Sequence, residues 1–170
     1  MDTRKTCAIG LAVAMVCAID SPVAQADDSY RMQIHPREVA GTWEVSHGYF
    51  KRAITLLEIA AAKSHRTSRD YGPIMNNLCV AYTLSGDFGR ARANCDRAVD
   101  FSYPPGLAMN NRGVLQALSG DLVAAAADFA AAKGRNESVE AAHYNSKRLD
   151  ELVSEVTRTS PATAATDPMT

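Results

Sequence analysis

The chain has 170 residues, with 18 Lys and Arg against 19 Asp and Glu, and a formal net charge of −1 at pH 7. This length fits one domain with flanking segments, and the balanced charge argues against a nucleic-acid-binding or polybasic membrane-surface protein, which needs a concentrated positive field. Aromatic residues make up only 6% of the chain, whereas alanine is abundant, and this composition suits closely packed helices better than a sheet.

Residues 1–26 have the features of a secretory signal peptide. Arg4 and Lys5 provide a positive start, residues 7–19 form an apolar run, and residues 24–26 are Ala-Gln-Ala, an A-x-A cleavage pattern. The run is shorter than the roughly 20 apolar residues that a membrane-spanning helix needs. We therefore expect cleavage before Asp27 and a periplasmic or secreted protein without a membrane span after cleavage.

The mature chain is expected to have three parts. Residues 27–36 are polar, show no clear periodicity and are predicted to form an N-terminal linker. Helical patterning extends over residues 37–156. Residues 157–170 are rich in Thr, Ala and Pro, and they have too few large apolar side chains to offset the entropy of ordering, so we predict a disordered tail.

The clearest helix pair is predicted within residues 71–105. Its first helix, about 73–85, carries apolar residues at i, i+3, i+4 and i+7, namely Met75, Leu78, Cys79 and Tyr82. Gly86 permits a left-handed turn, and Asp87 can cap a second helix over about 87–100.

Two short motifs recur along the chain with one offset. Met75-Asn76-Asn77 returns as Met109-Asn110-Asn111, and Ser85-Gly86-Asp87 returns as Ser119-Gly120-Asp121, both shifted by 34 residues. That is the length of the tetratricopeptide (TPR) helix–turn–helix unit. The chain resembles the TPR family at the positions that follow the family's order: Leu78, Tyr82, Gly86, Asp87, Phe88, Ala91 and Ala98, then Gly113, Gly120, Asp121, Leu122, Ala125, Phe129 and Ala132. It departs from the family at Cys79, Arg112 and Gln116, where Gly, Leu and an aromatic residue are usual.

The resemblance implies an all-α fold, a right-handed α-α superhelix of about three TPR-like helix pairs plus a C-terminal capping helix. The TPR-like domain covers residues 37–156, with units at about 37–70, 71–105 and 106–139 and a cap at 140–156. The first unit is the weakest match. Its offset to the second unit is 38 residues rather than 34, and Arg37 and Glu44 stand where apolar residues are expected.

Two cysteines, Cys79 and Cys95, remain after removal of the leader. They lie on the inner faces of paired helices, seven residues before Gly86 and nine after it. In an oxidising compartment this arrangement fits a disulfide, which would add roughly 3 kcal/mol of stability. Two buried free thiols filling the helix interface fit equally well.

By resemblance, the first helix of each unit lines a concave groove that holds an extended peptide or a partner helix. The residues expected along this partner-binding groove are Asn76, Val80, Thr83, Leu84, Asn110, Val114, Ala117, Leu118, Tyr144 and Arg148. Asn77, Asn111 and Asn145 match a family asparagine and are expected to bond neighbouring backbone groups. The alternative is that the groove is only a solvated or self-packed surface.

No catalytic or metal motif is present in the sequence. It contains no H-E-x-x-H, G-x-S-x-G or phosphate loop, and its four histidines are scattered singly. We expect no enzyme activity, no cofactor and no metal. The expected function is a non-catalytic protein–protein interaction scaffold or adaptor of the bacterial cell envelope, with an unidentified protein or peptide partner. The alternative is a structural or self-oligomerising envelope protein, with the groove filled by another copy or by its own N-terminal segment; the oligomeric state stays open.

Overall fold

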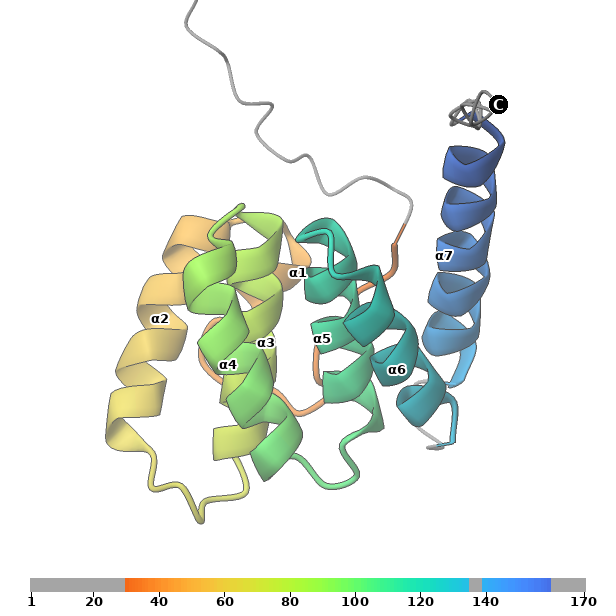
Figure 1. Cartoon of the computed structure of the whole chain (residues 1–170). Coiled ribbons are helices and arrows are strands. Elements are labelled where there is room, and N and C mark those ends of the chain that lie inside the picture. Colours follow the sequence, from red (N-terminus) through yellow and green to blue (C-terminus); the bar gives the residue numbers. More distant parts are fainter. Residues whose placement is uncertain (1–29, 135–138, 160–170) are drawn as a thin grey trace, which may run out of the picture.

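The computed structural model describes residues 30–134 and 139–159, so the expected signal peptide lies outside the described residues. Within these ranges the chain forms helices and no strand, which confirms the all-α class. The helices are α1 (Thr42–Ser46), α2 (Phe50–Lys63), α3 (Tyr71–Leu84), α4 (Phe88–Phe101), α5 (Gly106–Leu118), α6 (Leu122–Lys133) and α7 (Val139–Thr159), as Figure 1 shows. Helix α7 includes residues 157–159, which were expected to belong to the tail; residues 160–170 are not described.

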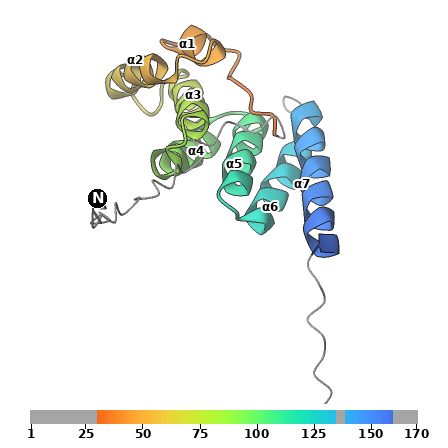
Figure 2. The ribbon, with the colours of Figure 1, turned by 90° about the horizontal axis from the view of Figure 1, so that it is seen from above.

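The helices pack in chain order, each against the next, and this gives a helical repeat-like fold (Figure 2). The odd-numbered helices also contact one another, α1 with α3, α3 with α5 and α5 with α7. Within the described part of the chain, α2 and α4 make no such contact, and neither do α4 and α6. The odd-numbered helices therefore form one continuous layer, and a chain lying across that layer can touch several units at once.

The turns inside the helix pairs share one backbone geometry. Gly48, Gly86 and Gly120 have φ values of 76°, 81° and 86°, in the left-handed region that glycine adopts at little cost. After two of these turns an aspartate caps the next helix: Asp87 accepts from the Arg90 N–H at 3.0 Å, and Asp121 accepts from the Ala124 N–H at 3.1 Å. The predicted roles of Gly86 and Asp87 are confirmed.

The first unit is shorter than the others. Helix α1 has only 5 residues, and Glu44, which stands where an apolar residue is usual, is buried and pairs with Arg52 at 3.2 Å. A turn of helix with a charged inward residue buries little apolar surface, which accounts for the weak sequence match of this unit.

Two hydrophobic clusters form the core. The larger one joins α1 to α5, and the smaller one joins α5, α6 and α7 through Val114, Ala125, Phe129 and Leu149. Met32, from the N-terminal side of the chain, packs against both clusters. Residues well outside the helices therefore contribute to the core.

Alanine substitutions at Gly113 and Gly120 compare the cost of overpacking with the cost of backbone strain. A Cβ at Gly113 would lie 2.7 Å from Cε1 of the fully buried Phe129, whereas a Cβ at Gly120 would meet no atom within 4 Å. We expect Gly113→Ala to lower the free energy of unfolding by about 3 kcal/mol through overpacking, and Gly120→Ala by only about 1 kcal/mol through its positive φ. Urea denaturation of both variants checks this order, and a larger loss for Gly120→Ala would contradict it.

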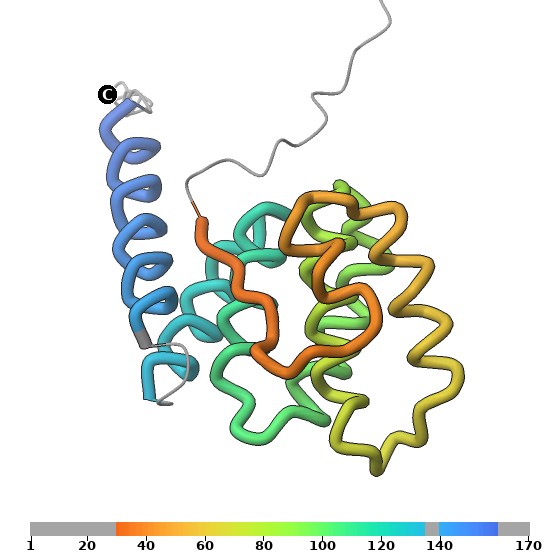
Figure 3. Tube along the Cα trace, turned by 180° about the vertical axis from the view of Figure 1, so that it is seen from behind, coloured from red at the N-terminus to blue at the C-terminus, as the bar shows by residue number. Residues whose placement is uncertain are grey.

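Residues 30–36 do not behave as a simple linker. This N-terminal segment runs in an extended path across α7, α5 and α3 before the chain turns into α1 (Figure 3). Its apolar side chains, Met32 and Ile34, pack against the core from outside the helices. The segment thus covers the face formed by the odd-numbered helices.

Candidate functional site

Five asparagines project from the odd-numbered helices toward the N-terminal segment. They are Asn76 and Asn77 on α3, Asn110 and Asn111 on α5, and Asn145 on α7, and all five have an exposed fraction of 0%. We call this set the asparagine ladder. The 34-residue offset places equivalent side chains on successive first helices, so the ladder is a direct consequence of the sequence repeat.

The ladder binds the main chain of the N-terminal segment at alternate residues. Arg31 donates its N–H to Asn145 Oδ1 at 2.7 Å, and its carbonyl accepts from Asn145 Nδ2 at 2.9 Å. Gln33 makes the same two bonds to Asn111, at 2.8 and 2.6 Å. One carboxamide therefore bonds both main-chain polar groups of one residue, and one unit of the helical array corresponds to two residues of extended chain.

The pattern ends at His35. Its N–H donates to Asn77 Oδ1 at 2.9 Å, but Asn77 Nδ2 donates to the Thr42 hydroxyl at 3.1 Å instead of to a carbonyl of the segment. Thr42 is the first residue of α1. The last asparagine of the ladder thus fixes both the segment and the start of the first helix.

The first asparagine of each pair links neighbouring units. Asn110 Nδ2 donates to the Arg31 carbonyl at 3.0 Å and Asn76 Nδ2 to the Gln33 carbonyl at 3.2 Å. Their own Oδ1 atoms accept from the next unit, Asn110 from Asn145 and Asn76 from Asn111, both at 2.9 Å. Since buried amides need partners, this chain of bonds ties α3, α5 and α7 to the segment and to each other.

Two side chains of the segment, Arg31 and Tyr30, also contact the helices. The Arg31 guanidinium lies 3.9 Å from the ring centroid of Tyr144, and its Nη1 is 3.6 Å from Glu140 Oε1. Tyr30 stacks on Phe129 with ring centroids 6.2 Å apart. The face therefore offers a cation site on α7 beside an aromatic contact on α6.

The expected groove residues fall into three groups. Asn76, Asn110 and Tyr144 contact the segment. Leu84 lines the hollow beside it, and Leu118 packs half-buried against the smaller core cluster. Residues that point into the helix packing or lie below the face are Val80, Val114, Thr83 and Ala117. Arg148 pairs with Glu151 on its own helix at 3.5 Å. Their binding of a partner stays a prediction.

The sequence interpretation named the N-terminal segment only as an alternative occupant of the groove, and it did not include the second asparagine of each pair in this site. Asn77, Asn111 and Asn145 do bond backbone groups, but those groups are 42, 78 and 114 residues away in the chain rather than neighbouring. The signal for the segment was the alternation of apolar Tyr30, Met32 and Ile34 with polar residues, which is typical of an extended chain with one buried side.

A hollow of about 440 Å³ lies beside the segment. Its lining comes partly from residues 30–33 and partly from the helices, through Leu84, Glu140 and Ala141. The Gln33 side-chain Oε1, in the same lining, is buried without a hydrogen-bond partner among the described residues. The face is therefore not completely filled by its own segment.

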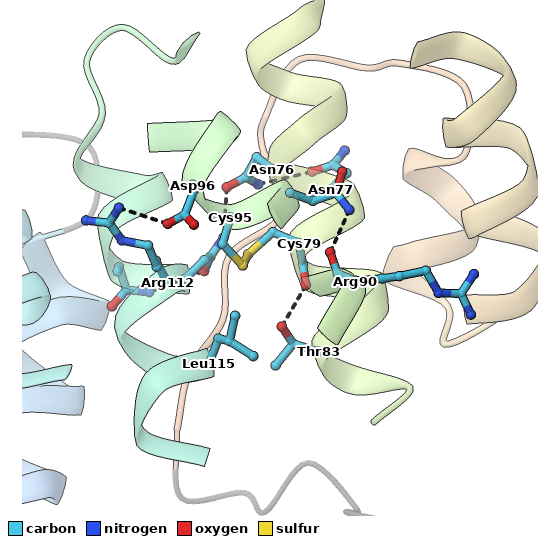
Figure 4. The surroundings of a disulfide bond; sticks show 12 residues. Asn76, Asn77, Cys79, Thr83, Arg90, Cys95, Asp96, Arg112 and Leu115 are labelled. Atoms are coloured by element: carbon cyan, nitrogen blue, oxygen red, sulfur yellow. Dashed lines mark hydrogen bonds and ion pairs between the residues drawn. A yellow bond between two sulfur atoms is a disulfide. The ribbon is translucent and has the colours of Figure 1, made fainter. Parts of the chain in front are cut away.

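A disulfide joins α3 to α4 behind the ladder. Cys79 and Cys95 are bonded with an S–S distance of 2.04 Å and a Cα–Cα distance of 4.7 Å, and both are fully buried. Figure 4 shows the bond, with Cys79 on the same helix as Asn76 and Asn77. Of the two alternatives for these cysteines, the structure has the disulfide.

Arg112 explains one departure from the repeat pattern. Its Nε and Nη2 bond the two carboxylate oxygens of Asp128 at 2.7 and 2.8 Å. Its Nη1 lies 3.2 Å from Asp96 (Figure 4). The bond to Asp128 raises the pKa of Arg112 above its ordinary value. A hydrogen-bonded ion pair thus links α5 to α6 and α4 where an apolar residue is usual.

The raised pKa of Tyr82 predicts that the free energy of unfolding depends on pH. Burial and a hydrogen bond to Glu58 raise the pKa of Tyr82 to about 12 from an ordinary 10.0. Between these values the unfolded chain loses the phenol proton while the folded chain keeps it, so the free energy of unfolding falls by up to about 1.4 kcal/mol per pH unit. Below pH 10 the contribution is constant. Denaturation of the wild type and Tyr82→Phe across pH 9–12 checks this, and equal slopes would contradict it.

Two further findings concern residues 30–134 and 139–159. Among them no group of three or more His, Cys, Asp or Glu side chains could hold a metal ion. No helix in the described ranges combines the length and apolar character needed to cross a bilayer.

Comparisons of this chain with protein-family models, curated proteins and solved structures give no match.

Proposed function

We propose that the chain is a non-catalytic protein–protein interaction scaffold of the bacterial cell envelope, built as a right-handed superhelix of TPR type. The 34-residue recurrence supports the family assignment, as do the paired helices with glycine turns and the continuous layer of first helices. The scaffold holds an extended polypeptide on the face that carries the asparagine ladder.

The observation that carries this proposal is the bonding of the ladder to main-chain groups. Two carboxamides, Asn111 and Asn145, each bind the N–H and the C=O of one residue of an extended chain. Main-chain recognition of this kind gives affinity for an extended peptide, while neighbouring pockets select its side chains. The face has the chemistry of a peptide-binding surface.

The envelope location rests on two independent features. The first 26 residues have a positive start, an apolar run and an A-x-A pattern. The Cys79–Cys95 disulfide suits a compartment outside the reducing cytoplasm. Sequencing the N-terminus of protein from a periplasmic fraction tests this; a chain retained in the cytoplasm with residues 1–26 attached would refute it.

Site-specific photocrosslinking in the native cell tests the binding function. A photoreactive residue replaces Leu84, which lines the hollow on the ladder face, or Arg97, which lies on α4 in a cleft of about 520 Å³. We expect a crosslinked partner from position 84 and none from position 97. No product from position 84, or equal products from both positions, would refute binding at this face.

A structural role without a ligand is the second candidate. It is favoured by the packing of Met32 and Ile34 against the core, because these contacts close the face with the chain's own residues. If this alternative holds, position 84 gives no product in cells, and the segment stays closed in solution.

A further inference from the structure

The N-terminal segment is held by contacts that another chain could make. Its bonds to Asn111 and Asn145 use only main-chain atoms, which every polypeptide carries. Arg31 is exposed, and the side chains from Met32 to His35 are only half-buried, whereas the ladder itself is fully buried. The side chains of the segment are therefore less buried than the asparagines that bind its main chain, although Met32 and Ile34 pack against the core.

Room for an incoming chain exists next to the segment. The hollow of about 440 Å³ is bounded by the segment on one side and by Leu84, Glu140 and Ala141 on the other. Gln33, whose buried Oε1 has no hydrogen-bond partner among the described residues, is one of the residues that line this hollow. A second polypeptide can begin to bind there before the segment has fully left.

The side-chain contacts define what the incoming chain must carry. The Tyr144 ring and the Glu140 carboxylate together bind a cation, by a cation–π contact and an ion pair. Met32 and Ile34, on either side of Gln33, fill apolar positions against the core. An acidic residue in place of Arg31 would meet the Glu140 carboxylate and be repelled.

We propose that residues 30–35 are an exchangeable internal ligand, and that the partner is an extended segment of another protein with Arg or Lys at the place of Arg31 and apolar residues at the places of Met32 and Ile34. This inference rests on the proposed peptide-binding function and names its ligand class and its regulation. The internal segment keeps the ladder covered until a matching partner displaces it.

Peptide binding to the full mature chain tests the proposal. The probe is a fluorescein-labelled peptide with the sequence of residues 27–38, and the acceptor is Ile34→Asp, which weakens docking of the internal segment and leaves the ladder unchanged. We expect Ile34→Asp to bind this peptide at least tenfold more tightly than the wild type, whose tethered segment competes at a high effective concentration. Fluorescence anisotropy measures both affinities.

Two controls define the specificity. A peptide with Glu at the place of Arg31 should bind Ile34→Asp at least tenfold more weakly, and adding Asn111→Ala to Ile34→Asp should abolish binding. A folded Ile34→Asp chain that binds neither peptide, or that binds both equally, overturns the proposal.

Hydrogen exchange of the wild type keeps the test decisive if Ile34→Asp fails to fold. The amides of Arg31, Gln33 and His35 donate to ladder side chains, so their protection reports release of the segment. We expect them to exchange at least tenfold faster than buried amides of α3 and α5. Exchange at the same rate as those helices would show that the segment leaves only on global unfolding and would overturn the proposal.

The two proposals can fail separately. Peptide exchange in vitro without a crosslinked partner in cells would remove the scaffold function and keep the internal ligand. A partner crosslinked in cells, together with a segment that never leaves the face, would keep the scaffold function and overturn the exchangeable internal ligand.

Discussion

Removing the Cys79–Cys95 disulfide lowers the free energy of unfolding by about 3 kcal/mol. The bond spans a sequence separation of 16 residues, and constraining a loop of that size in the unfolded chain contributes roughly this amount. For a domain of this size the melting temperature should fall by roughly 10 °C. Urea denaturation of the mature protein with and without reductant measures the loss.

The double variant Cys79→Ala, Cys95→Ala is the matched control for this experiment. Its stability should be close to that of the reduced wild type, and it should not change when reductant is added. Both side chains are fully buried at the contact of α3 with α4, so the variant also loses some packing. Equal denaturation midpoints for oxidised and reduced wild type, with two free thiols titrated in the reduced form, would contradict the predicted stabilisation.

The helices themselves could be predicted because their signals are local. Apolar spacing and the Gly-Asp turn placed one pair at about 73–85 and 87–100, and the structure has α3 at Tyr71–Leu84 and α4 at Phe88–Phe101. Each boundary differs by two residues or fewer, because helix ends depend on caps and on the preceding turn. The repeat in the sequence carried the prediction from one pair to the next.

The N-terminal segment could not be predicted in the same way. Its alternation covers only residues 30–34, and an extended chain of that length has no stability of its own. Its partners are asparagines up to 114 residues away, and local spacing contains no information about such contacts. The bonds between the ladder and the segment form only where the folded helices bring these groups together.

Replacing Asn111 by alanine should release the middle of the N-terminal segment and lower the free energy of unfolding by about 3 kcal/mol. Asn111 accepts from the Gln33 N–H and donates to the Gln33 carbonyl and to Asn76 Oδ1. Its loss leaves the Gln33 N–H and Asn76 Oδ1 without this partner, whereas the Gln33 carbonyl keeps its bond from Asn76 Nδ2. Each unsatisfied buried polar group costs about 1–3 kcal/mol. Urea denaturation measures the loss of stability, and hydrogen exchange at Gln33 measures release of the segment.

Asn94→Ala is the matched control, since it removes a buried asparagine from α4, away from the ladder face. Asn94 makes a single bond within its own helix, to the Arg90 carbonyl at 2.8 Å, so the expected cost is about 1 kcal/mol. It should leave exchange at Gln33 unchanged. Equal losses of stability for the two variants, with no faster exchange at Gln33 in Asn111→Ala, would mean that the ladder does not hold the segment. A larger loss for Asn111→Ala together with faster exchange at Gln33 would attribute the difference to release of the segment, because Asn111 bonds the segment whereas Asn94 bonds its own helix.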